Sequence, residues 1–482
     1  MQKRNRTIPN WLKGSFVRVG PGKYELHGSF CLNHWFDGYA VLYKFDIRDG
    51  RVMFSKRYLE SDAYKKAETN GKPIYTEFGT RGYPDTSKNI FFRMVTNFNP
   101  SHLTDNDFTN IFRVQDDLYV STETCFIRRI DAKTLETKEK VDYHKAVGVN
   151  LASSHPHVDR DGTTYNLGAS FLHGLRYDVI KIPPGGKGAG LLKNASLMCH
   201  VPARSKTNFS YYHSFGMSEN YLVIIEQPMV NRFVVVEKGT GKILKTSFYS
   251  SAPFFYFHHA NTYEIDGQLV VDVIGFDSPE IVDKFFLDKL RSPDFDLIDR
   301  GHLLRFVLPL IEGDAVKNAP KGENLVHLEG WEMRAEKVEQ GHHHHGEHII
   351  LTPDTTGHIG YETPCVNPHF VGRPYRYLFV SGFFDPGDFR NSLVKMDLET
   401  KEVLTWFDSE FTYPGEPQFI PSPNGGGVEE DDGILIASVK DVRPGNPDFL
   451  LILDARDMKE IGRALVQDFI PIGLHGIFIP AK

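Results

Sequence analysis

The fold of this chain is decided by a stretch that reads FDIRDGRV (45–52), in which an acidic residue follows an apolar one and a polar turn leads back to an apolar residue. This pattern predicts a strand, a tight turn built on Asp and Gly, and a returning strand. One such outer hairpin per unit is typical of a β-propeller, and here the spacing of the units is uneven. Four other stretches repeat the pattern: IDAKTLET (130–137), VEKGTGKI (236–243), MDLETKEV (396–403) and LDARDMKE (453–460).

Short β-rich runs occur along most of the chain, and Gly, Pro, Asp and Asn separate them. The best candidate for a helix is SPEIVDKFFLDKLRSP (278–293), whose apolar residues recur at three- and four-residue spacing. So many short strands predict an all-β sandwich, barrel or propeller. The runs include YAVLYKFDI (39–47), DLYVSTETCFIRRI (117–130), YLVIIEQP (221–228), QLVVDVIGF (268–276), YRYLFVSGFF (375–384), GILIASVKDV (433–442) and FLLILDAR (449–456).

The composition is that of an ordinary globular protein, with 40% apolar and 24% charged residues among 482. No low-complexity linker divides the chain, so we expect a single domain over residues 1–482. Two polar stretches that contain glycine, GHHHHGEH (341–348) and SPNGGGVEEDDG (422–433), are expected to be surface loops. The net charge of -7 argues against a nucleic-acid partner, which would call for a basic groove.

Cysteine usage and hydropathy bear on the compartment. Since no CxxC pair is present, we expect neither a zinc knuckle nor a redox motif, and so few cysteines suit a reducing environment. The N-terminal MQKRNRTIPNWLKGSF lacks the apolar core of a signal peptide, and no run reaches the ~18–20 apolar residues that span a bilayer. The sequence therefore predicts a cytoplasmic protein. Its cysteines are Cys31, Cys125, Cys199 and Cys365.

Histidines in apolar or aromatic surroundings are the strongest chemical signal. They occur in SSHPHVD (153–159), YYHSFG (211–216), FYFHHANTYE (255–264) and IGLHGIFI (472–479). A lone histidine of this kind is usually a satisfied core residue, but four are harder to explain in that way. A buried neutral imidazole must pair both ring nitrogens, and a metal ion with a carboxylate does this well.

The spacing of these histidines fits a metal site on a propeller axis. From His155 to His213 and from His213 to His258 is about one blade each, and from His258 to His475 is about four, at roughly 40–50 residues a blade. Innermost strands of different blades face one channel, where imidazoles suit Fe, Zn, Cu or Ni. Adjacent residues such as His258 and His259 face opposite sides of a strand, but alternation cannot separate His155 from His157.

Three glutamates lie in comparable surroundings: Glu123 in STETCFI, Glu362 in GYETPC and Glu416 in YPGEPQF. Each is either an ordinary carboxylate at a turn or strand edge, or the acceptor of the distal imidazole N–H of a metal ligand. A carboxylate that accepts the N–H on the far side of the ring from the metal fixes the tautomer and the orientation of that ring. These residues are therefore the candidates for orienting the histidines.

Many of these motifs together resemble the carotenoid cleavage oxygenase family. The similarity runs from about residue 10 to 480, keeps the family's order, and is greatest to the animal branch of β-carotene oxygenases, retinoid isomerase and insect carotenoid isomerooxygenases. The motifs include HWFDGYAVLYKF (34–45), TEFGT (76–80), STETCFI (121–127), YYHSFGMSENYLVIIEQP (211–228), FHHANTYE (257–264), YPGEPQF (413–419) and LHGIF (474–478).

The resemblance implies a seven-bladed β-propeller with an axial iron and a dome of loops and helices above it. The implied Fe(II) ligands are His155, His213, His258 and His475, and the implied carboxylates behind them are Glu123, Glu362 and Glu416. Family position also suggests that Phe78, Thr122 and Phe257 line the substrate site, although Thr122 could be an ordinary strand residue and Phe257 an ordinary core aromatic.

The implied reaction adds O2 across one C=C bond of a carotenoid and leaves two carbonyls. Central (15,15') cleavage coupled to trans-to-cis (11-cis) isomerisation is the leading variant. The alternatives within the family are eccentric (9',10') cleavage and a non-oxidative retinoid isomerohydrolase acting on retinyl esters. A carotenoid-binding propeller without chemistry would be expected to lack a ligand histidine, and a zinc hydrolase would keep three protein ligands and an open position.

Two departures from the family concern membrane contact. Vertebrate members carry a cysteine-containing segment where this chain has YPDTSKNIF (83–91), so lipidation is not expected there. The stretch around 229–240 is also shorter than in relatives, where an apolar membrane-contacting loop is typical. Peripheral contact with a membrane surface for substrate uptake remains part of what the resemblance implies.

Overall fold

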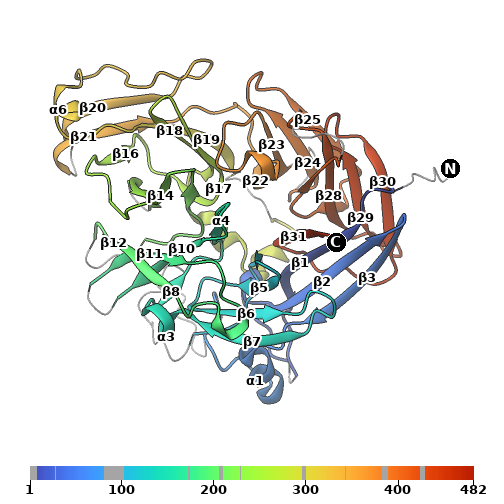
Figure 1. Cartoon of the computed structure of the whole chain (residues 1–482). Coiled ribbons are helices and arrows are strands. Elements are labelled where there is room, and N and C mark those ends of the chain that lie inside the picture. The colour runs from blue at the N-terminus through green and yellow to red at the C-terminus, as the bar shows by residue number, and fades with distance from the viewer. Residues whose placement is uncertain are drawn as a thin grey trace.

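The computed structural model describes residues 8–481 apart from 28, 81–102, 172–173, 206–209, 228–229, 296–299, 342–343, 383–388 and 424–428. The described residues form mostly β-structure in seven sheets, which Figure 1 shows arranged around a common centre. The prediction of an all-β protein is therefore confirmed. Most strands pair antiparallel with the next strand of the chain, so that each sheet is largely built from one continuous segment.

The sheets follow one another along the chain with two exceptions: the first also contains the last strand, and the fourth also contains β20 and β21, which follow the strands of the fifth. In chain order of their first strands, the first sheet contains β1 (Gly14–Lys23), β2 (Tyr39–Arg48), β3 (Arg51–Tyr58) and β31 (His475–Pro480); the second contains β4 (Asn110–Val114), β5 (Asp117–Ser121), β6 (Phe126–Ile130) and β7 (Thr137–Asp142); and the third contains β8 (Leu151–Ala152), β9 (His157–Val158), β10 (Thr164–Ser170), β11 (Arg176–Ile182) and β12 (Ser196–Pro202). The fourth sheet contains β13 (Gly216–Met217), β14 (Tyr221–Glu226), β15 (Arg232–Glu237), β16 (Phe248–Ser250), β20 (Arg334–Gly341) and β21 (His344–Thr352), and the fifth contains β17 (Phe255–Ile265), β18 (Gln268–Phe276) and β19 (His302–Pro309). The sixth sheet contains β22 (Tyr361–Cys365), β23 (Tyr377–Gly382), β24 (Ser392–Asp397) and β25 (Val403–Phe407), and the seventh contains β26 (Thr412–Pro414), β27 (Gln418–Pro421), β28 (Gly433–Asp441), β29 (Asp448–Asp454) and β30 (Glu460–Val466).

Turn chemistry explains why the repeated hairpins form. In four of them the fourth residue after the acidic one has a positive φ, and its N–H donates to the carbonyl of the acidic residue. In three of these four the Asp side chain also accepts one or more N–H groups of its turn, which favours Asp there. These positive-φ positions are Leu135, Gly241, Lys401 and Met458.

FDIRDGRV closes by a different turn. Arg48 pairs with Arg51, so the loop holds only Asp49 and Gly50, and both have positive φ, as a tight two-residue hairpin requires. Its Asp46 lies within β2, where its carboxylate forms an ion pair with Lys44 at 2.7 Å. All five predicted hairpins are therefore confirmed, but one of them uses a different turn.

The first and last strands join the two ends of the chain. β31 pairs antiparallel with β1, from Gly14 opposite Pro480 to Val19 opposite His475. Arg18 of β1 is fully buried and donates to the carbonyls of Gly473 and Leu474, just before β31. The innermost end of this sheet is thus built from residues more than 450 positions apart.

Two predictions of local structure were wrong. The expected helix over 278–293 is broken into α4 (Glu280–Lys284) and α5 (Leu287–Leu290), because Phe285 and Leu287 exchange backbone hydrogen bonds with the segment 33–35. The expected loop at 341–348 includes strand residues, since His344–His348 belong to β21 and pair with β20. In the other expected loop, 422–433, residues 424–428 lie outside the described part of the chain.

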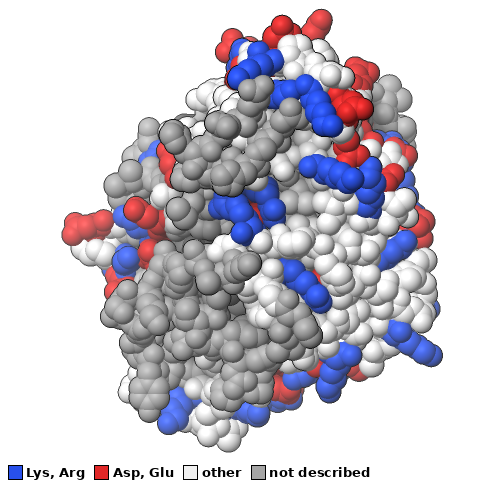
Figure 2. Space-filling view, turned by 90° about the vertical axis from the view of Figure 1, so that its left-hand side faces the viewer, with Lys and Arg blue, Asp and Glu red and all other residues white. Residues whose placement is uncertain are grey.

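No helix in the described ranges is long and apolar enough to cross a bilayer. On the side seen in Figure 2, Lys and Arg side chains lie in several separate groups, and Asp and Glu side chains gather mainly near the margins. That side therefore carries mixed charge.

Candidate metal centre

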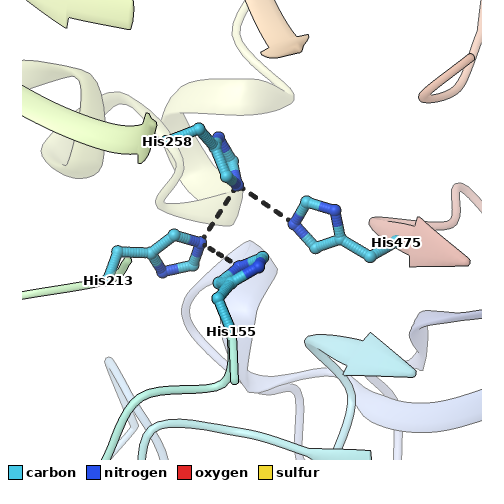
Figure 3. Close-up of side chains that lie close together, drawn as sticks. All are labelled: His155, His213, His258 and His475. Carbon is cyan, nitrogen blue, oxygen red and sulfur yellow. Dashed lines mark hydrogen bonds between the residues drawn. The ribbon is translucent and has the colours of Figure 1, made fainter. Parts of the chain in front are cut away.

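Four histidines from distant parts of the chain meet near the centre of the molecule. One ring nitrogen of each of His155, His213, His258 and His475 lies within 4.8 Å of the corresponding atom of the other three. Figure 3 shows the rings converging from four separate segments. The Nε2 atom of His213 is 2.9 Å from that of His155 and 3.2 Å from that of His258, and His258 is 3.1 Å from His475.

The ends and irregularities of strands place these rings. His155 lies between β8 and β9, His213 precedes β13, and His475 is the first residue of β31. His258 lies inside β17, where the register with β18 shifts on either side of His259. A β-bulge of this kind re-aims a side chain, which explains how a residue within a long regular strand reaches the centre.

Three glutamates accept hydrogen bonds from the far sides of the rings. Glu123 binds Nδ1 of His213, Glu362 binds Nδ1 of His258 at 2.6 Å, and Glu416 binds Nδ1 of His475 at 2.7 Å. An ionised carboxylate only accepts hydrogen bonds, so each Nδ1 must carry the hydrogen and each Nε2 must be a bare lone pair.

Bare lone pairs cannot bond to one another, so the convergence calls for a cation. Ligand atoms that meet at right angles about 2.1 Å from an ion lie roughly 3.0 Å apart, which agrees with the Nε2 separations of 2.9, 3.1 and 3.2 Å. Four neutral imidazoles suit a first-row transition metal. Three carboxylates behind them, of which Glu362 is buried and Glu123 and Glu416 are half-buried, offset the charge of such an ion. The residues present therefore fit a metal.

His155 differs from the other three rings. Its Nδ1 has the amide of Asn110 at 3.5 Å, and the same amide donates to the carbonyl of Ser154 at 2.8 Å. Among the described residues no carboxylate contacts this ring, so its tautomer is set less firmly than those of the other histidines.

Burial favours the neutral form of two of the histidines, His155 and His258. It lowers the pKa of His258 to about 4, although Glu362 acts to raise it, and it lowers the pKa of His155 well below the usual value with help from the neighbouring rings. Burial would raise the pKa of Glu362, but the His258 ring outweighs it and the pKa is lowered. Near neutral pH the rings of His155 and His258 can therefore bind a cation without first losing a proton.

The neighbouring histidines of each pair point elsewhere. Nε2 of His157 donates to the carbonyl of Phe215 at 2.8 Å, and Nδ1 of His259 lies 3.1 Å from the hydroxyl of Ser214. Neither belongs to the cluster. Strand alternation had separated His258 from His259, whereas only the folded loop separates His155 from His157.

Sequence reasoning missed two residues that hold the carboxylates. The hydroxyl of Tyr211 donates to Glu123 at 2.9 Å, and the buried Arg18 contacts Glu416 at 3.5 Å while also donating to its backbone carbonyl at 2.9 Å. Tyr211 stands two residues before His213, which is a usable signal. Arg18 lies 398 residues from Glu416, and nothing in its local sequence marks it.

The shift of register beside Glu362 has its own cause. β22 has an irregular register with β23 between Glu362 and Cys365, and Thr363 adopts a φ of 50°, which is rare for a β-branched residue. The hydroxyl of Thr363 bonds the carbonyl of Glu362 and the hydroxyl of Ser381. Strain of this kind persists where the surroundings enforce it, and here it turns Glu362 toward His258.

A cavity of about 70 Å³ opens beside the rings of His213, His258 and His475. Phe257 lines it, together with other aromatic residues. The other two residues proposed to line the substrate site, Thr122 and Phe78, do not line this cavity. The hydroxyl of Thr122 lies 3.3 Å from that of Thr109, which does line it, and Phe78 packs against Phe36 and His34. The segment 83–91 lies outside the described residues. The aromatic lining residues are Trp35, Phe36, Phe257, Phe276, Phe285, Tyr361 and Phe389.

The fold and the site together define a mostly β protein in which four histidines, two buried and two half-buried, form a cluster that fits a metal ion. Residues 6–232 and 230–480 match the family described as retinal pigment epithelial membrane protein, RPE65, and the chain belongs to that family. The resemblance seen in the sequence is therefore confirmed at the level of the family.

Curated relatives and solved structures cover nearly the whole chain. The carotenoid-cleaving dioxygenase, mitochondrial, of Mustela putorius furo is 37% identical over 98% of this chain and 92% of its own. The beta,beta-carotene 15,15'-dioxygenase of Rattus norvegicus is 38% identical over 98% and 88%. A cobalt-substituted Synechocystis apocarotenoid oxygenase has a TM-score of 0.75 at 24% identity and covers 99% of this chain and 94% of that one, which supports the fold.

Proposed function

We propose that this chain is an iron(II)-dependent oxygenase that cleaves a C=C bond of a carotenoid with O2. The observation that carries the proposal is the cluster of four histidines beside a cavity walled by aromatic side chains. Relatives with 37–38% identity over 98% of the chain, which bear the names of carotenoid dioxygenases, support the same substrate class.

The fold fits this role as a seven-bladed β-propeller that forms one domain over residues 1–482. The seven sheets of the described residues are the blades in this proposal, and the pairing of β1 with β31 closes the ring. The short segments 35–37 and 280–290, which contribute Trp35, Ile281 and Phe285 to the cavity, belong to the dome above the metal.

His155, His213, His258 and His475 hold the iron in this proposal, and Glu123, Glu362 and Glu416 orient three of the rings. When bound, iron(II) supplies the redox-active centre that lets O2 react with an unsaturated hydrocarbon. The protein itself contributes no charged ligand atom. Its part is to present four neutral nitrogen atoms in a fixed arrangement, which the carboxylates maintain.

Substrate selection falls to the cavity walls. One C=C bond and one O2 give two C=O groups, so the balance needs no further reductant. Phe257 and its aromatic neighbours hold the flat polyene beside the histidines and exclude water, and the position of the chain within the cavity selects the bond that is cut. Phe78 and Thr122 keep their proposed place farther from the metal, around the walls.

Central (15,15') cleavage is the proposed outcome, with the names of the relatives as support, and coupling to 11-cis isomerisation is the leading variant. Eccentric (9',10') cleavage and non-oxidative turnover of retinyl esters are the alternatives that a product analysis separates. A cytoplasmic location with peripheral contact to a membrane surface also remains a proposal.

Anaerobic loading with Fe(II) and incubation with β-carotene or zeaxanthin, followed by admission of O2 and chromatography of the products, tests the function. Two C20 aldehydes are expected, and an 11-cis form of one of them would reveal isomerisation. A protein that makes no O2-dependent product from any carotenoid, yet turns over retinyl esters, would contradict the oxygenase assignment.

A further inference from the structure

Two arginines, Arg300 and Arg390, interrupt the aromatic wall of the cavity beside the histidine cluster, and Arg300 has interactions of its own. Arg390 and its neighbour Phe389 line the same cavity as His213, His258 and His475. Glu362, which orients His258, is close enough to act on the charge of Arg390. Burial lowers the pKa of the Arg390 guanidinium, and Glu362 opposes this effect.

Within the described part of the chain, Arg390 donates no hydrogen bond and forms no ion pair. A guanidinium carries five N–H donors, and leaving them unpaired away from bulk water is costly. The buried arginines of the described residues, Arg18, Arg128 and Arg305, each have a carboxylate partner, whereas the half-buried Arg390 has none there. Among the described residues, the Arg390 guanidinium contacts the ring of Phe389, 5.4 Å from the ring centroid, but its N–H donors have no hydrogen-bond acceptor.

We propose that Arg390 donates hydrogen bonds to an uncharged oxygen atom carried by the polyene ligand, which extends the proposed function and rests on it. A hydrocarbon carotenoid offers no acceptor. A hydroxyl or keto oxygen of an oxygenated carotenoid does, and so does the carbonyl oxygen that cleavage creates. The carboxylate of Glu362 beside Arg390 disfavours an anionic ligand, so a neutral carbonyl or hydroxyl is the fitting class.

The contacts of Glu362 argue against a purely structural role for Arg390, in which the arginine would hold this carboxylate in place. Oxygen Oε1 of Glu362 is buried and has no hydrogen-bond partner among the described residues, yet it forms no ion pair with Arg390. The other oxygen, Oε2, already accepts from His258 and from the backbone N–H of Thr363. Since the carboxylate is held without the arginine, the guanidinium remains available to a ligand in the cavity.

Binding to the iron-loaded full chain under nitrogen tests the proposal without turnover. Zeaxanthin, β-carotene and all-trans-retinal are titrated against wild type, Arg390→Met and Arg390→Lys, with quenching of tryptophan fluorescence as the readout, since Trp35 lines the cavity. Arg456→Met, which removes a half-exposed arginine side chain, is the matched control. Iron content is measured for each protein.

We expect Arg390→Met to bind at least one oxygen-bearing ligand about 10- to 100-fold more weakly, with β-carotene binding and iron content unchanged and with partial recovery in Arg390→Lys. Loss for zeaxanthin alone identifies the acceptor as an oxygen brought by the substrate. Loss for retinal identifies it as the carbonyl formed at the cut bond. Unchanged binding of both, equal loss for β-carotene, or loss of iron would overturn the proposal.

The proposed function can fail separately. If wild-type protein binds these ligands but makes no product once O2 is admitted, the oxygenase assignment is contradicted, while the difference in binding between wild type and Arg390→Met still decides the role of the arginine.

Discussion

His258 and His259 stand next to each other in β17, yet only the first belongs to the cluster. His258→Ala removes one of the four nitrogen ligands that we propose, so purified protein should lose most of its metal. His259→Ala removes a ring that contacts Ser214 and should keep the metal, at a loss of about 1–3 kcal/mol in the free energy of unfolding. Metal analysis of the two purified variants, with a urea unfolding curve for each, checks this prediction.

The same experiment has an internal control, because both variants remove an imidazole from the same strand. A metal-free His259→Ala that unfolds normally would contradict the assignment of His258 as the ligand. His213→Ala, from a different sheet, should behave like His258→Ala.

The carboxylates are predicted to act on metal affinity through the rings. Glu362→Gln leaves an amide that accepts the His258 N–H more weakly and supplies no charge, so metal affinity should fall about 10- to 100-fold. Competition with a chelator of known affinity measures the change. Glu430→Gln is the control, since Glu430 accepts two backbone N–H groups, of Arg376 and Tyr377, far from any cluster histidine in the sequence. Equal affinity in Glu362→Gln and wild type would show that the carboxylate is dispensable.

Among the elements, hairpins were predictable and the broken helix was not. A hairpin depends on a few adjacent residues, such as Asp131 and Leu135, whose turn forms its own hydrogen bonds. The segment 278–293 has the periodicity of a helix, but Phe285 and Leu287 bond to a segment some 250 residues earlier, and these tertiary contacts prevail over local propensity.

The site shows the same division. Alternation along β17 separates His258 from His259, because that region is a strand. It fails for His155 and His157, because His155 lies in the connection before β9. Arg18 and Arg390 could not be found from sequence, since their importance comes from contacts with residues that only the folded chain brings near.

The close pairing of β31 with β1 requires a glycine at position 476, because a side chain there would have no room. A Cβ there would lie 2.6 Å from the carbonyl oxygen of Val17 and 2.7 Å from the side chain of Arg18, and the Gly476 N–H donates to Glu416. Gly476→Ala should therefore displace His475 and Glu416 together, lower the free energy of unfolding by about 1–3 kcal/mol, and reduce the metal bound. Thermal unfolding and metal analysis measure the two effects.

Gly239→Ala is the matched control for this substitution, because nothing lies within 4 Å of the methyl group that it adds. The prediction fails if Gly476→Ala keeps both the stability and the full metal content of the wild type.

For the molecule as a whole, buried histidines predict a loss of stability in mild acid. His34 is fully buried, donates from Nε2 to the carbonyl of Val282 at 2.8 Å, and accepts the N–H of Phe36 at Nδ1. Burial lowers its pKa from 6.5 to about 4. Between these values the unfolded chain binds more protons than the folded one, so the free energy of unfolding falls as pH falls.

His34 alone should account for about 3 kcal/mol of that fall between pH 6.5 and 4. Asp37 acts in the opposite direction, since burial raises its pKa to about 6 and the folded chain then holds the proton. The diagnostic quantity is therefore the difference between wild type and His34→Gln in urea unfolding across this range. The variant should show a flatter dependence, and parallel curves would refute the prediction.

The four rings of the cluster become available at different times as the chain is made. His258 precedes His475 by 217 residues, and at about 5–20 residues per second the ribosome needs roughly 10–40 s to cover that distance. During this interval β1 has no partner in β31, and Glu362 and Glu416 are each absent for part of it. The proposed site therefore cannot be complete before His475 has been made, and a metal ion that binds earlier meets an incomplete set of ligands.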